Sequence, residues 1–139
     1  MAVIEELIRT EPDGGISFGN YKLDKKTKRT DFEVGADLYY VKTFKEITRL
    51  ERNDTVLYES VPGTSVTGMK LEDGCLRFTV EGDHDVQITL GLSEDVEYRV
   101  VINGNPADRI RTSMGGKLAF SVNLAGTGKA EIEVTEVDD

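Results

Sequence analysis

The sequence predicts an all-β protein: an antiparallel β-sandwich, jelly-roll-like, or a flattened barrel of about ten or eleven short strands. Two observations carry this prediction. From Cys75 to Val134 apolar and polar residues alternate, and a turn-forming pair stands at almost every break. No stretch except residues 3–10 has the spacing of an amphipathic helix. Side chains two apart share one face of a strand, so each segment has one face to bury and one to leave in water.

The C-terminal half supplies the clearest strands, over residues 65–71, 75–80, 86–92, 98–102, 118–124 and 130–134. Asp73-Gly74 and Asn103-Gly104 are residue pairs that favour type I′ hairpin turns. Residues 115–116 and 126–128 are glycine-rich breaks. The residues predicted to face the core are Leu76, Phe78, Val80, Val86, Ile88, Leu90, Leu92, Tyr98, Val100, Ile102, Leu118, Phe120, Val122, Leu124, Ala130, Ile132 and Val134.

The N-terminal half is less regular. Residues 3–10 fit a helical stripe as well as a frayed strand, but the turn at residues 12–15 favours a hairpin with residues 16–23. Residues 31–34, 38–44, 47–51 and 55–61 are predicted strands, with a tight connection at residues 52–54. The polar residues 24–31 are predicted to form a loop, in which Lys25, Lys26, Lys28 and Arg29 are either solvated or a docking patch for an acidic partner.

The length of 139 residues suits one domain that spans residues 1–139. Pro62-Gly63 is the most natural position in the chain for a boundary between two subdomains. About 62 residues of short strands would make a marginal core alone, so we expect the two halves to share sheets.

Composition excludes several classes of protein. With 38% hydrophobic and 31% charged residues the chain is neither disordered nor a membrane protein, since no apolar run approaches about 20 residues. The net charge of −9 argues against binding to nucleic acid. The first residues lack the pattern of a secretory signal, so we expect a cytoplasmic protein. Cys75 is the single cysteine, which excludes an intramolecular disulfide.

No catalytic constellation is visible, and we expect neither an enzyme nor a cofactor. His84 is the single histidine and lies between Asp83 and Asp85 in a polar turn, where flanking acids favour the imidazolium rather than a general base. No nucleophile elbow, phosphate loop or paired-cysteine motif is present. Asp83 and Asp85 are weak candidates for a calcium ion; the alternative is a solvated acidic turn.

Carbohydrate binding by a β-sandwich usually relies on exposed aromatic rings that stack on sugar faces. The chain has no tryptophan, which leaves tyrosines as candidates. Because Tyr39 and Tyr40 are adjacent, they must face opposite sides of a strand, and at least one should point outward. The candidate ligand-binding residues are Tyr21, Tyr39, Tyr40 and Tyr58.

The sequence carries two resemblances to known families. The strands at residues 98–105, 116–124 and 130–134 resemble non-catalytic C-terminal β-sandwich modules of bacterial polysaccharide-processing enzymes. With residues 37–50 and 57–64, the whole chain is similar to short stand-alone bacterial proteins labelled endosialidase-like. The sialidase pattern of an arginine triad, a tyrosine nucleophile and Trp-containing propeller boxes is not matched, so no catalytic residue carries over.

The sequence therefore predicts a non-catalytic binding or interaction protein, either a homo-oligomer or a partner of another protein. A carbohydrate-binding module is the first alternative, and an enzyme or enzyme subunit that acts on glycans is the second. Tyrosines that line a groove would favour the glycan alternative, whereas an apolar patch on a sheet face would favour self-association.

Overall fold

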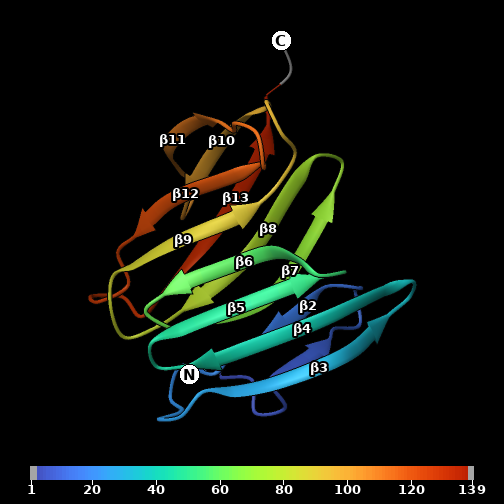
Figure 1. Ribbon diagram of the computed structural model, residues 1–139. Coiled ribbons are helices and arrows are strands. Elements are labelled where there is room, and N and C mark those ends of the chain that lie inside the picture. The colour runs from blue at the N-terminus through green and yellow to red at the C-terminus, as the bar shows by residue number, and fades with distance from the viewer. Residues whose placement is uncertain (1–2, 138–139) are drawn as a thin grey trace.

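A computed structural model describes residues 3–137 and shows two antiparallel sheets packed face to face (Figure 1). The seven-stranded sheet has the order β1-β2-β7-β8-β13-β10-β11, and the six-stranded sheet has the order β12-β9-β6-β5-β4-β3. The strands are β1 (Ile8–Thr10), β2 (Ile16–Phe18), β3 (Thr27–Val34), β4 (Asp37–Phe44), β5 (Ile47–Arg52), β6 (Thr55–Val61), β7 (Ser65–Glu72), β8 (Cys75–Glu81), β9 (Val86–Gly91), β10 (Glu97–Ile102), β11 (Asn105–Arg111), β12 (Lys117–Val122) and β13 (Lys129–Glu136).

The all-β prediction is confirmed, and the two separate sheets make the molecule a sandwich rather than a closed barrel. The number of strands was underestimated, since the described residues form thirteen. No helix within residues 3–137 has the length and hydrophobicity needed to cross a membrane.

The two halves of the chain share both sheets, as expected. In the larger sheet β2 pairs with β7, and in the smaller sheet β6 pairs with β9, so strands from either side of Pro62-Gly63 are hydrogen-bonded to each other. The hydrophobic core also contains residues from both halves of the chain. The ring of Tyr58 packs edge-to-face on Phe18, with centroids 5.2 Å apart, and on Phe78, at 5.7 Å.

Alternation predicted the buried faces correctly. All of the predicted core positions in β8, β9, β12 and β13 are buried, and in β10 Tyr98 and Val100 are buried while Ile102 is partly so. Leu92, just beyond β9, is also partly buried. The hairpin turns are confirmed by backbone geometry, because Asp73 and Gly74 have φ of 51° and 75°, and Asn103 and Gly104 have φ of 52° and 80°.

Two predictions about local structure were wrong, and one strand was not predicted. Residues 24–31 are not all loop, since β3 begins at Thr27 and places Lys28 and Arg29 on an edge strand. The strand that was not predicted is β11, which contains Pro106; an exposed edge tolerates proline. The first hairpin is shorter than predicted: β1 and β2 have three residues each, because Leu7 at φ 75° and Gly19 at φ 95° turn the chain out of the strands.

Two β-bulges interrupt β6 and β7, which follow each other in the chain but lie in different sheets. In β6 the pairing with β5 slips between Leu50 and Glu51, which leaves Leu57 as an extra residue and lets both Leu57 and Tyr58 point inward. In β7 the pairing with β8 slips between Thr67 and Lys70. Gly68, at φ 65°, occupies this second bulge, and Met69 beside it is buried.

Candidate functional site

One of the concave features of the described residues is an open cleft between the two sheets. It has a volume of about 480 Å³, within the range of roughly 300–1,000 Å³ typical of small-molecule sites. Eight of its eighteen lining residues have aliphatic side chains. The aliphatic lining residues are Ile16, Val56, Leu57, Met69, Leu71, Leu76, Leu92 and Val134.

The two β-bulges supply part of the cleft wall. Leu57 comes from the bulge in β6, and Met69 follows Gly68 in the bulge in β7. A bulge re-aims side chains that regular alternation would place elsewhere, and bulges are common beside binding sites. The cleft therefore lies where both sheets depart from regular pleating.

Two tyrosines, Tyr39 and Tyr98, also line the cleft. Tyr39 on β4 is paired with Arg52 on the adjacent strand β5. Burial raises the pKa of the Tyr39 hydroxyl, and the Arg52 guanidinium partly offsets this effect. Tyr98 on β10 accepts a hydrogen bond from the Ser93 amide, at 3.1 Å. Tyr39 and Tyr98 are only 6% and 5% exposed, so their rings are almost fully packed.

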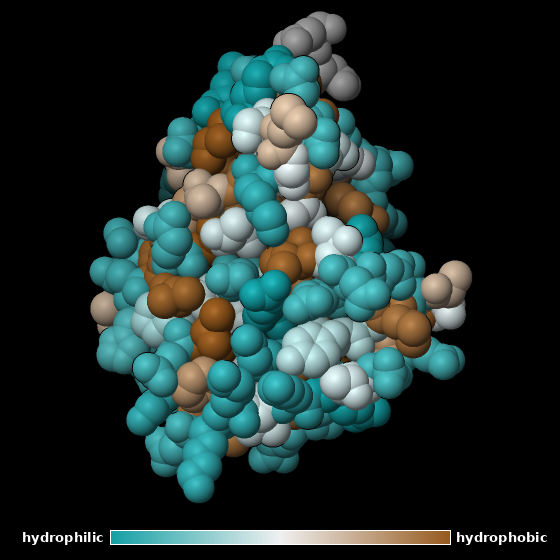
Figure 2. All heavy atoms as spheres, in the orientation of Figure 1, coloured by the Kyte–Doolittle hydropathy of each residue, from teal (hydrophilic) through white to brown (hydrophobic). Residues whose placement is uncertain are grey.

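The mouth of the cleft combines charged and exposed apolar residues. Arg52, Lys117 and Glu136 supply the charges. Leu71 at the mouth is 52% exposed, and Met114, next to the lining residue Gly115, is 90% exposed. In Figure 2, hydrophobic atoms interrupt the hydrophilic surface in the middle of the face shown. Such a mouth suits a ligand with both an apolar part and a polar part.

Gly74 fixes one side of this mouth. A Cβ atom added at Gly74 would lie 2.8 Å from Oε2 of Glu136, and the Glu136 amide donates to the Gly74 carbonyl at 2.9 Å. The turn between β7 and β8 is thereby held against the end of β13. A side chain at position 74 would displace the Glu136 carboxylate.

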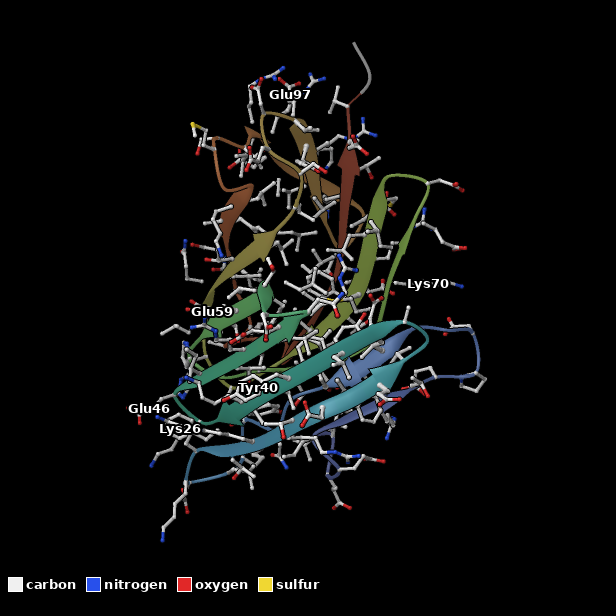
Figure 3. The ribbon with its side chains drawn as sticks, turned by 45° about the vertical axis from the view of Figure 1, so that its right-hand side comes forward. Lys26, Tyr40, Glu46, Glu59, Lys70 and Glu97 are labelled. Atoms are coloured by element: carbon white, nitrogen blue, oxygen red, sulfur yellow. The ribbon has the colours of Figure 1, made fainter. Side chains whose placement is uncertain are left out.

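The four tyrosines named from sequence lie in different places. Tyr58 is fully buried in the core, and Tyr21 is 5% exposed, so neither presents a ring to a ligand from outside. Tyr39 lines the cleft, and Tyr40 lies partly exposed on the outer face of its sheet (Figure 3), as alternation requires. Tyr98 was predicted only as a core residue, because alternation shows which face is buried but not which buried residue borders a cleft.

Tyr40 lines a second, more open depression of about 650 Å³, to which Tyr39 also contributes. Its lining is polar, with Asp31, Glu51, Asn53 and Asp54 beside the ring. One partly exposed ring beside carboxylates and an amide offers a single stacking surface for a sugar.

The acidic turn at Asp83 and Asp85 is engaged in contacts within the protein. Asp83 forms an ion pair with Lys22, with Oδ2 and Nζ 2.8 Å apart, and Asp85 accepts a hydrogen bond from the Ala125 amide at 3.0 Å. No group of three or more histidine, cysteine or acidic side chains within residues 3–137 could hold a metal ion. His84 between them is exposed, as predicted.

Comparison of the chain with models of protein families, with curated proteins and with solved structures found no match.

Proposed function

We propose that this protein is a non-catalytic binding protein, which takes up a small molecule with an apolar body and a polar end. The observation that carries the proposal is the inter-sheet cleft, whose lining combines eight aliphatic side chains with the charged residues Arg52, Lys117 and Glu136. Apolar surface removed from water contributes roughly 25 cal/mol per Å² of binding free energy, and the charges at the mouth orient the polar end.

The lining residues favour an apolar ligand over a sugar. Sugar binding needs accessible ring faces, whereas the rings of Tyr39 and Tyr98 are almost fully packed. Catalysis is not part of the proposal, because His84 lies on an exposed turn away from the cleft lining. Arg52, Lys117 and Glu136 are therefore assigned to ligand orientation.

Dye displacement tests the proposal. An environment-sensitive apolar dye should fluoresce more strongly with the protein, and decanol and decanoate should displace it while maltose should not. Val56→Phe should fill the cleft and weaken decanol binding by about tenfold, which corresponds to about 1.4 kcal/mol. Val61→Phe is the matched control, because Val61 lies on the same strand, is exposed and does not line the cleft.

Three results would contradict the proposal. The first is no displacement by either decyl compound, and the second is an equal loss of binding in both variants. The third is displacement by maltose that disappears in Tyr40→Ala, which would move the binding site to the outer face and support the glycan alternative.

A further inference from the structure

Three of the four strands that end the sheets are protected against pairing with another chain. β1 has only three residues. β3 carries exposed Lys28 and Arg29 and an irregular register next to Asp31, whose φ is 54°. β11 contains Pro106 and a break in its register with β10. Short length, charge, proline and bulges are the usual devices that prevent edge-to-edge association.

β12 has none of these devices except one lysine at its start. Its six residues pair with β9 without a register shift, and it contains neither proline nor glycine. Leu118, Phe120 and Val122 are buried, while Ala119 and Ser121 are exposed. The β12 edge of the six-stranded sheet is therefore regular in its pairing and uncharged beyond Lys117.

The backbone of β12 also offers free hydrogen-bonding groups. The Leu92 amide donates to the Gly116 carbonyl at 2.8 Å, so Gly116 points toward β9. Residues of an antiparallel strand point alternately toward one neighbour and the other. The N–H and C=O groups of Lys117, Ala119 and Ser121 are thus directed to the open edge.

Charge favours a second copy of this chain at that edge. The chain holds 26 acidic residues and a net charge of −9, so two copies repel each other over most orientations. The segment from Arg111 to Ala130 contains no aspartate or glutamate, and it carries Arg111, Lys117 and Lys129. β12 lies in the middle of this acid-free segment, where two copies approach with the least repulsion.

We propose that β12 pairs antiparallel with β12 of a second copy, about a two-fold axis at Ala119, and joins the two six-stranded sheets. In this register Leu118 faces Phe120 of the other copy on the inner side, and Lys117 faces Ser121 on the outer side. Paired residues stay on the same face of the joined sheet, and no like charges are directly opposed.

The molar mass in solution tests this proposal. Light scattering between about 10 µM and about 1 mM should show the mass rising toward twice the 15.4 kDa of one chain. Ala119→Lys should place two ammonium groups opposite each other at the axis and weaken the dimer at least about tenfold. Ala107→Lys, the same change at an exposed position of the edge strand β11, should leave the dimer intact.

A mass that stays at one chain over the whole range would overturn the proposal, as would a dimer that Ala119→Lys does not weaken. If Ala119→Lys does not fold, hydrogen exchange of the unmodified protein decides. The Ala119 and Ser121 amides should become more protected as protein concentration rises, while the β11 amides should not. Equal protection at all concentrations would exclude β12 as the interface.

Discussion

A network of buried hydroxyl groups begins at Tyr58, the largest fully buried side chain of the described residues. The Tyr58 hydroxyl lies 2.7 Å from Oγ1 of Thr64, which also lies 2.7 Å from Oγ of Ser60. Thr48 donates to the Thr64 carbonyl at 2.7 Å and shares a 2.8 Å hydrogen bond with Thr43. A buried polar group without a partner costs about 1–3 kcal/mol, so these contacts are what allow Tyr58 to be fully buried.

The Tyr58 hydroxyl makes the stability of the fold depend on pH in the alkaline range. Burial raises its pKa well above the ordinary value, against the weaker effect of its hydrogen bonds to Thr64 and Ser60. Below about pH 10 the hydroxyl is protonated in both states; above it the unfolded chain loses the proton first, so stability falls as pH rises.

Tyr58→Phe should make the free energy of unfolding fall less steeply with pH, by an amount that corresponds to about one proton lost on unfolding. Urea unfolding between about pH 9 and pH 12 measures this slope. Phe120→Leu is the control, because it also disturbs a buried ring but removes no titratable group. Identical slopes for Tyr58→Phe and the unmodified protein would contradict the assignment.

At the scale of elements, two β-bulges contribute to the wall of the cleft. The extra residues in β6 and β7 bring Leu57 and Met69 to its wall. The β7 bulge depends on Gly68, whose φ of 65° lies in the left-handed region that costs other residues roughly 1–2 kcal/mol.

Gly68→Ala should therefore destabilise the protein by about 1–2 kcal/mol in urea unfolding, although a Cβ there would meet no atom within 4 Å. Gly126→Ala is the matched control: its surroundings are equally open, but its φ lies outside the left-handed region, so we expect about 0.5 kcal/mol or less. Equal effects of the two variants would show that the bulge does not depend on this backbone conformation.

At the scale of the whole molecule, the aromatic contacts of Phe18, Tyr58 and Phe78 join strands from both halves of the chain. Shared sheets and a shared core leave neither half with a separate interior. Pro62-Gly63 is thus a change of sheet, from β6 in the smaller sheet to β7 in the larger one.

We expect the chain to unfold in one cooperative transition. Tyrosine fluorescence and far-ultraviolet circular dichroism should give the same urea midpoint. Phe18→Leu and Phe78→Leu should each shift that single midpoint, by about 1–2 kcal/mol of stability. Two separate transitions, each shifted by one variant only, would instead divide the chain into two domains.

Local sequence determined most of the secondary structure. Alternation identified the buried faces of β8, β9, β10, β12 and β13, because a strand repeats every two residues whatever lies beside it. Hairpin turns could be predicted from pairs such as Asp73-Gly74, since the backbone preference of these residues needs no distant contact. Alternation did not identify the start of β3 before Asp31, because an exposed edge strand has no buried apolar face there.

The cleft was decided only by the tertiary structure. Tyr39, Leu57, Met69 and Tyr98 come from four strands of two sheets, and no spacing along the chain relates them. Two of these positions also depend on bulges, which shift the pairing with a neighbouring strand. By itself the sequence determined that the chain forms strands and which faces they bury, since these properties are local; the order of the strands, and hence the cleft and the open edge at β12, follows from how distant segments pack.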